Sequence, residues 1–167
     1  MKTKLILFLS VIVMVLSCEI QNKENSTTYY LIRHAEKEND GTKNPHLSKK
    51  GLERVEKLKT FFANKKINAV YSTDYWRTKE TAIPIAEINS LSIELYNPDS
   101  LKIDSLIKKD KHKNVLIVGH SNTTPFLVNE ILNESKYQVI SEDVYNEIFI
   151  VKVNRKGEVI DEVIKID

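Results

Sequence analysis

Cysteine is almost absent from this chain, with Cys18 as the only one among 167 residues. A single cysteine excludes an intramolecular disulfide. Because Cys18 lies close to the start, it also leaves the folded part without a cysteine nucleophile or a cysteine-based metal cluster. Glycine is scarce too, with four residues in the chain. Since no glycine-rich phosphate loop ends in lysine, nucleotide binding of the P-loop kind is disfavoured.

A large excess of one charge is also missing. Lysine and arginine number 25, aspartate and glutamate number 23, and the formal net charge is +2. The lysines are scattered along the sequence and form no basic stripe. We therefore expect no nucleic-acid partner, and we interpret the lysines as solvated faces of amphipathic helices.

A long hydrophobic run occurs at the start of the chain. Met1–Lys4 is basic, and Leu5–Leu16 is apolar apart from Ser10. This run is too short for an ordinary membrane span and is typical of a secretory signal. It ends in Val-Leu-Ser-Cys, which resembles a bacterial lipoprotein cleavage box. That resemblance implies cleavage before Cys18 and a lipid on its thiol. The alternative is a plain signal peptide with an incidental cysteine.

The chain divides into three parts. Residues 1–17 are the expected lipoprotein signal peptide, and residues 18–27 have little apolar content, so we expect a flexible tether. Residues 28–167 are expected to form one domain with a single core. We expect this domain in the bacterial cell envelope, outside the cytoplasm, held on a membrane by the lipid on Cys18.

Short apolar runs alternate with helical patterns along residues 28–167. The runs predict strands at 28–33, 69–72, 92–96 and 114–119, and apolar spacing predicts helices within 48–62, 74–88, 100–109 and from 123 onward. Ser48 is a candidate N-cap, and Pro84 predicts a kink or a break near Ile83. Segments 147–154 and 158–166 flank a turn and predict a hairpin. The fold class is therefore α/β: three layers, with helices on both faces of a mostly parallel sheet and an antiparallel C-terminal hairpin.

Polar residues follow three of these apolar runs: Arg33 and His34, then Arg77, then His120. The carboxyl ends of parallel strands meet at one edge of a sheet, so we expect these side chains to converge. Two guanidinium groups suit the oxygens of a phosphoryl group. One imidazole, kept neutral by neighbouring cations, could attack phosphorus. The second, kept protonated by the phosphate dianion, could stabilise the charge on the transferring oxygens.

Four motifs carry a family resemblance: Arg33-His34-Ala35-Glu36, Leu47-Ser48-x-x-Gly51, residues 71–82 with Arg77, and Gly119-His120-Ser121. In this order they resemble the histidine phosphatase superfamily, the phosphoglycerate mutase-like group, in the branch without a His-Asp pair at the second histidine. The resemblance runs from Tyr29 to Phe149 and implies a phosphoglycerate mutase-like fold. It also implies that His34 is the phosphorylated nucleophile, that Arg33, Arg77 and His120 form the phosphate pocket, and that no metal or other cofactor is needed.

Other polar residues near the strand ends are candidates for substrate contacts. Thr73, Ser121 and Asn122 could donate to phosphate or substrate, although helix capping is the more economical interpretation of Ser121 and Asn122. Glu36 could orient Arg33 or lie at the pocket mouth, or it could be a solvated loop charge. A metal site of His34, His120 and Glu36 is disfavoured because two arginines would repel a cation.

The family's proton donor is commonly a glutamate shortly after the third strand. Ile103 stands about where that acid would lie, so the nearby substitutes are Asp99, Glu94 and Asp104. Small phosphohistidine phosphatases of the superfamily lack such a donor.

We expect a metal-independent phosphatase that acts on a phosphorylated small molecule or a phosphoprotein. Two alternatives stay open: a non-catalytic lipoprotein that binds phosphorylated ligands, and a phosphotransferase of the phosphoglycerate mutase type. The chain lacks the large insertions of sugar-phosphate mutases, which disfavours the last.

Overall fold

The computed structural model of this protein describes residues 26–167. The expected signal peptide and lipidated Cys18 lie outside the described residues, as does the tether up to residue 25. The first strand, β1 (Thr27–Arg33), begins one residue before the predicted start. Within residues 26–167, none of the helices has both the length and the apolar character that crossing a bilayer requires.

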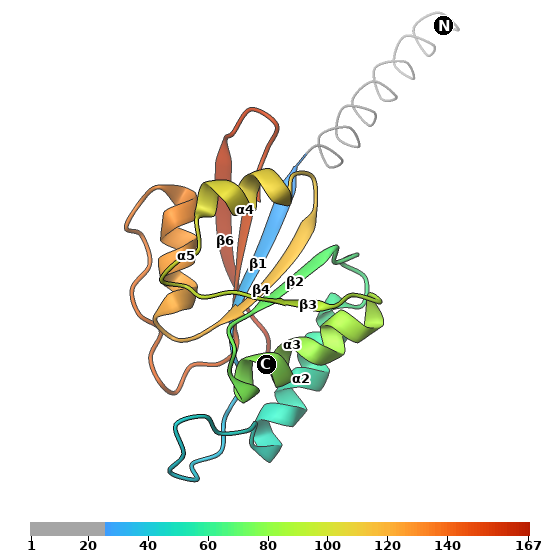
Figure 1. The fold of residues 1–167 in the computed structure, drawn as a ribbon, viewed down its shortest axis with the longest axis vertical. Helices are drawn as coiled ribbons and strands as arrows, with labels where there is room; N and C mark the ends of the chain where they lie inside the picture. Colours follow the sequence, from blue (N-terminus) through green and yellow to red (C-terminus); the bar gives the residue numbers. More distant parts are fainter. Residues whose placement is uncertain (1–25) are drawn as a thin grey trace, which may run out of the picture.

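The described chain has six strands and four helices, which alternate as far as β5 (Figure 1). After β1 they are α2 (Lys49–Phe62), β2 (Ala69–Ser72), α3 (Trp76–Ile88), β3 (Ile93–Leu95), α4 (Ile103–Lys109), β4 (Asn114–Gly119), α5 (Thr123–Leu132), β5 (Glu147–Val153) and β6 (Val159–Lys165). β2 and β4 have the predicted bounds. α3 and α4 begin two to three residues later than predicted, and β3 is shorter than predicted.

All six strands form one sheet in the order β3-β2-β4-β1-β5-β6. β3, β2, β4 and β1 are mutually parallel, whereas β5 is antiparallel to β1 and β6 is antiparallel to β5. The predicted mostly parallel sheet with an antiparallel C-terminal hairpin is therefore confirmed. β1 lies between β4 and β5 and is buried along its whole length, so its carboxyl end is near the middle of the sheet.

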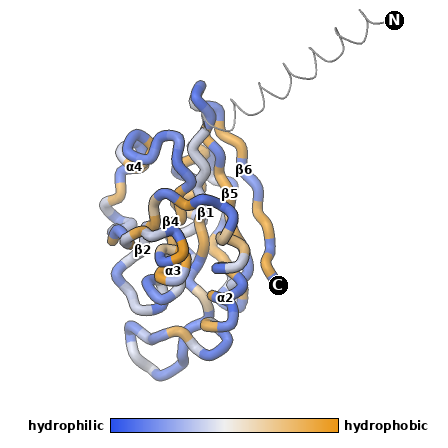
Figure 2. The backbone as a smooth tube through the Cα atoms, turned by 90° about the vertical axis from the view of Figure 1, so that its right-hand side faces the viewer, coloured by the Kyte–Doolittle hydropathy of each residue, from blue (hydrophilic) through white to orange (hydrophobic). Residues whose placement is uncertain are grey.

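Helices cover both faces of the sheet. Successive residues of a strand point to opposite sides, so alternate residues of β4 pack against different helices. Val115 and Ile117 of β4 belong to the core cluster that contains residues of α4 and α5. Leu116 and Val118 belong to the cluster that contains residues of α2 and α3. The predicted three-layer α/β architecture is thus confirmed. Figure 2 shows hydrophobic stretches along the strands and hydrophilic loops around them.

Of the kink or break expected near Ile83, the break is wrong, because α3 continues without interruption through Pro84. The kink stays a prediction. A proline inside a helix removes one hydrogen bond and crowds the preceding turn. Here Ala82, Ile85 and Ala86 are buried on either side of the proline. Their burial against the sheet holds the helix together across the missing bond.

The first turn of α2 approaches the loop after His34 closely. Ser48 caps this helix as predicted, since its hydroxyl accepts from the backbone N–H of Gly51 at 3.2 Å. A Cβ built on Gly51 would lie 2.0 Å from the carbonyl oxygen of Glu36, so only glycine fits there. The backbone N–H of Ser48 also donates to that carbonyl, at 2.9 Å. These contacts fix the loop that leaves His34.

Candidate active site

His34 lies just past the end of β1 and is 3 % exposed. Its backbone N–H donates to the carbonyl of Gly119 at 3.0 Å, which ties it to the end of the neighbouring strand β4. Its ring Nδ1 lies 2.7 Å from the carbonyl oxygen of Ala35. Because a carbonyl only accepts, Nδ1 carries the proton of the neutral ring. The Nε2 atom is then left with a lone pair, as a nucleophile requires.

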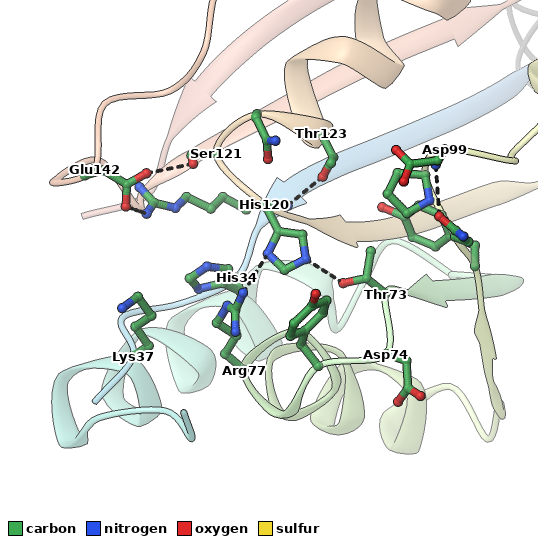
Figure 3. Close-up of a pocket in the computed structure, with 16 residues that line it drawn as sticks. His34, Lys37, Thr73, Asp74, Arg77, Asp99, His120, Ser121, Thr123 and Glu142 are labelled. Atoms are coloured by element: carbon green, nitrogen blue, oxygen red, sulfur yellow. Dashed lines mark hydrogen bonds and ion pairs between the residues drawn. The ribbon is translucent and has the colours of Figure 1, made fainter. Parts of the chain in front are cut away.

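His120 follows β4, and its ring lies beside that of His34 (Figure 3), with centroids 5.5 Å apart and planes at 69°. Arg77 Nη2 donates to its Nδ1 at 3.4 Å, and its Nε2 lies 2.9 Å from Thr73 Oγ1. A guanidinium group can only donate, so Nδ1 accepts and the Nε2–H donates to Thr73. The two histidines therefore hold opposite tautomers.

Both histidines are neutral at pH 7. Burial, with the charges of Arg77 and Arg33, lowers the pKa of His120 to about 4. Burial is also the largest cause that lowers the pKa of His34 to about 3, and it outweighs the opposite effect of the Ala35 carbonyl. This low pKa agrees with the expectation of a neutral His34. Desolvation contributes more to it than the neighbouring cations do.

Arg77 comes from the first turn of α3, and its guanidinium carbon lies 4.4 Å from the centre of the Tyr75 ring. Its Nε and Nη1 are buried and have no hydrogen-bond partner within the described chain. Burial lowers the pKa of Arg77 below its ordinary value. Buried donors of a cation are costly without an acceptor. Their arrangement suits an anionic ligand.

Arg33, at the end of β1, is held by a segment more than a hundred residues away. Its Nη1 donates to the carbonyls of Ser141 and Val144 at 2.9 and 3.0 Å. Its Nη2 donates to Glu142 Oε2 at 2.7 Å, and its guanidinium carbon lies 4.1 Å from the centre of the Tyr145 ring. The Nε of Arg33 is buried and has no partner among residues 26–167.

Sequence reasoning missed this holding segment, Ser141–Tyr145, altogether. It precedes the final hairpin as a short polar stretch, and nothing in its composition distinguishes it from a solvated loop. In the structure it reaches the end of β1, where Glu142 also accepts from Ser121 Oγ at 2.7 Å. Contacts across such a separation have no signal in the local sequence.

These side chains line an open cleft of about 860 Å³ at the carboxyl ends of the parallel strands (Figure 3). Of the residues predicted from the sequence, the cleft is lined by Arg33, His34, Thr73, Arg77, Asp99, His120, Ser121 and Asn122. Lys37, Tyr96 and Glu142 are among the lining residues that were not predicted. Asn122 occupies the N-cap position of α5, but its side chain makes no capping hydrogen bond.

Glu36 is not among the residues that line the cleft, and the predicted contact with substrate is corrected accordingly. Its carboxylate is 10 % exposed and accepts from Arg54 Nε at 2.8 Å and from Arg54 Nη2 at 2.7 Å. Burial raises the pKa of Glu36, but the hydrogen bonds from Arg54 outweigh this and hold that pKa below its usual value. Glu36 thus attaches the loop after His34 to α2.

Two of the three candidate proton donors also lie outside the cleft. Glu94 is exposed on β3 and pairs with Lys109, and Asp104 is exposed in the first turn of α4. β3 and α4 place both carboxylates away from the cleft lining. Asp99 alone of the three lines the cleft.

The arrangement presents two imidazoles and two guanidinium groups to one cleft. Residues 26–167 contain no group of three or more His, Cys, Asp or Glu side chains placed to hold a metal ion. In particular, the carboxylate of Glu36 binds Arg54. Chemically, the cleft can bind an oxyanion beside a neutral, nucleophilic imidazole nitrogen.

Comparison with known proteins gives a consistent result. Residues 29–97 match the family model described as the histidine phosphatase superfamily (branch 1). No curated protein matches the sequence. Among solved structures, the protein histidine phosphatase SixA in complex with tungstate is similar with a TM-score of 0.65 at 15 % identity, over 83 % of this chain and 96 % of that one.

Two further solved structures show the same fold. The mycobacterial glucosyl-3-phosphoglycerate phosphatase has a TM-score of 0.68 at 10 % identity, over 85 % of this chain and 100 % of its own. The phosphoserine phosphatase from Entamoeba histolytica in complex with 3-phosphoglyceric acid has a TM-score of 0.66 at 15 % identity, over 84 % and 98 %. The likeness therefore extends over most of the described domain.

Proposed function

From the match of residues 29–97 to the family model, we propose that this chain is a member of the histidine phosphatase superfamily and a phosphatase that cleaves phosphoric monoesters through a phosphohistidine on His34. One observation carries the proposal. The unprotonated Nε2 of His34 and the unpartnered donors Nε and Nη1 of Arg77 belong to residues of the same cleft. A nucleophile and an oxyanion binder are thus both present before substrate arrives.

In the first step, Nε2 of His34 attacks phosphorus, and the bond from phosphorus to the leaving oxygen breaks with its electron pair on that oxygen. Arg77 donates to the equatorial phosphoryl oxygens, which spreads the charge that develops. The Ala35 carbonyl holds the Nδ1 proton and supports the cationic ring that forms. In the second step, water attacks phosphorus, the N–P bond breaks, and inorganic phosphate leaves neutral His34 behind.

The substrate we propose is a phosphorylated small molecule or a phosphoprotein. SixA is, by its name, a protein histidine phosphatase, and the two other structures described above are, by their names, phosphatases of small metabolites.

Hydrolysis of p-nitrophenyl phosphate by wild type and His34→Asn tests the proposal. We expect turnover by wild type and a loss of at least a thousandfold in the variant, because the nucleophile is missing. His112→Asn is the matched control: His112 is exposed, lies outside the cleft, and has a φ of +63° that asparagine tolerates. Quenched wild type should carry an acid-labile, base-stable phosphoryl group.

Other outcomes would replace this proposal. Tight phosphate binding without turnover would indicate a protein that captures phosphorylated ligands. Turnover that requires a phosphorylated metabolite to prime His34 would indicate a mutase. A base-labile phosphoenzyme would point to a nucleophile other than histidine.

We also propose that Cys18 carries a lipid that holds the domain on a membrane of the cell envelope. The support is the sequence of the first 18 residues. Labelled palmitate should enter the wild-type protein in bacterial cells, and Cys18→Ser should abolish both the label and the membrane fraction. Equal labelling of both proteins would contradict the proposal.

A further inference from the structure

Lysines that are scattered in the sequence come together at the end of the sheet opposite the cleft. Three connections meet there: residues 63–68 before β2, the end of α4 with residues 110–113 before β4, and the turn 154–158 between β5 and β6. In Figure 1, α4 and the β5–β6 turn lie on the same side as the start of β1.

Hydrogen bonds and strand register join these three connections. Asn114 Nδ2 donates to the carbonyl of Lys65 at 2.7 Å, and the backbone N–H of Thr28 donates to the carbonyl of Lys113 at 2.8 Å. Thr27 is paired with Val153, the last residue before the β5–β6 turn. The three connections are therefore neighbours in space.

We define the basic end by six cationic residues of these connections: Lys65, Lys66, Lys108, Lys111, Arg155 and Lys156. All are exposed apart from Lys65, which is half-buried. None of the six forms an ion pair with another residue of the part that the structure describes. Unpaired cations on neighbouring loops give a surface of strong positive potential.

Few carboxylates oppose this charge within the same connections. Asp110 is fully buried and already paired with Lys113 at 3.0 Å. Glu158 is exposed and accepts from Asn154. The near-zero net charge of the chain thus hides a local excess of positive charge at this end of the folded molecule.

We propose that the basic end binds the surface of a bilayer that contains anionic phospholipids. Flexible lysine and arginine side chains on adjacent loops suit a planar array of phosphate headgroups, and clusters of such residues are attracted to anionic membranes. Nucleic acid is the other polyanion that such a surface could contact. The bilayer is favoured because β1 starts at this end with Thr27, nine residues after Cys18 in the sequence.

This placement has a consequence for orientation. Nine residues span at most about 32 Å when fully extended. A lipid on Cys18 would therefore hold the basic end close to the bilayer, and the cleft at the opposite edge of the sheet would open away from it. The orientation and the choice of a bilayer over nucleic acid rest on the proposed lipid, whereas neither rests on phosphatase activity.

Co-sedimentation with vesicles tests the binding without the lipid anchor. The chain would start at Glu19, since residues 26–167 contain every strand, helix and core cluster of the described fold. The probes are vesicles of phosphatidylcholine alone and vesicles with one third phosphatidylglycerol. We expect binding to the anionic vesicles only, weakened as salt is raised.

A charge-reversal variant and its matched control locate the surface. Lys111→Glu/Lys156→Glu should weaken binding to the anionic vesicles by at least tenfold. A control with the same type of change, Lys43→Glu/Lys49→Glu, alters exposed lysines in the loop and helix start that follow His34. It should change binding by less than twofold.

Three results would overturn the proposal: equal binding to both kinds of vesicle, equal loss in the variant and its control, or tighter binding to a DNA duplex than to anionic vesicles. Cooperative urea unfolding of the variants, measured without substrate, shows that they are folded. Since vesicle binding and turnover are separate measurements, failure of this proposal is distinguishable from failure of the proposed function.

Discussion

Glu142 Oε2 accepts a hydrogen bond from Arg33 Nη2 at 2.7 Å and so joins an exposed carboxylate to a buried guanidinium. The side chain of Arg33 is 3 % exposed and that of Glu142 is 75 % exposed. Both residues line the cleft. A phosphoryl group that is to bind this edge of Arg33 must therefore compete with a carboxylate that already lies on it.

Replacing Glu142 by glutamine should strengthen phosphate binding. The variant removes a negative charge next to the expected phosphate site and weakens a charge-assisted hydrogen bond on Arg33. We expect the inhibition constant of inorganic phosphate to fall about threefold to tenfold, measured in p-nitrophenyl phosphate hydrolysis. Asp143→Asn, which removes the same charge from a neighbouring exposed side chain, should change it by less than twofold. Weaker phosphate binding in Glu142→Gln would mean that Glu142 positions Arg33 instead.

Of the three proton donors considered from the sequence, Asp99 is the one that lines the cleft. If it protonates the leaving oxygen, Asp99→Asn should slow hydrolysis of phenyl phosphate by about tenfold to a hundredfold. Hydrolysis of p-nitrophenyl phosphate should change little, because its leaving group is stable as an anion. Glu94→Gln serves as the control outside the cleft and should affect neither substrate. Equal losses on both substrates would rule out the role of donor.

Stability should fall in acid because of the two cleft histidines. Their pKa values, about 3 for His34 and about 4 for His120, lie below the ordinary 6.5. The unfolded chain therefore binds more protons than the folded chain between pH 6.5 and about 4. The free energy of unfolding should drop by up to about 1.4 kcal/mol per pH unit for each histidine. Below about pH 3 both histidines are protonated in the folded chain as well, and the stability that their neutral forms contributed is fully lost.

Urea unfolding at pH 7 and pH 5 measures this effect. The double variant His34→Asn/His120→Asn should lose less stability between the two pH values than wild type does. The control His112→Asn, at an exposed position, should keep the wild-type dependence. An identical loss in all three proteins would show that other groups cause the acid sensitivity.

Glu36 should matter for stability and not for substrate affinity. Glu36→Gln leaves the guanidinium of Arg54 without its bidentate acceptor, and that side chain is 16 % exposed. We expect a loss of about 2 kcal/mol in the free energy of unfolding. The KM for p-nitrophenyl phosphate should stay within twofold of wild type. Glu38→Gln, at an exposed neighbouring site, should lower the free energy of unfolding by less than about 0.5 kcal/mol, as is usual for surface positions. A large rise in KM would restore Glu36 to the substrate site.

The local pattern of residues determined the fold class and the core of the site. Apolar runs of 69–72 and 114–119 predicted two central strands to the residue, because a buried parallel strand must be apolar on both faces. The positions of Arg33, His34, Arg77 and His120 after such strands then required convergence, since parallel strands end at one edge. The break predicted near Pro84 is wrong because the burial of residues on both sides of it outweighs the local tendency of proline to end a helix.

The tertiary structure alone decided the contacts between segments that are distant in the sequence. The sheet order decides which loops become neighbours. It thereby decides the contacts of Ser141–Tyr145 with Arg33, the pairing of Glu36 with Arg54 and the clustering of cations at the basic end. A sequence shows the charge of each side chain. Whether that charge meets a partner, a cleft or open solvent is set by chain segments that lie far away along it, and it becomes visible only once the sheet has assembled.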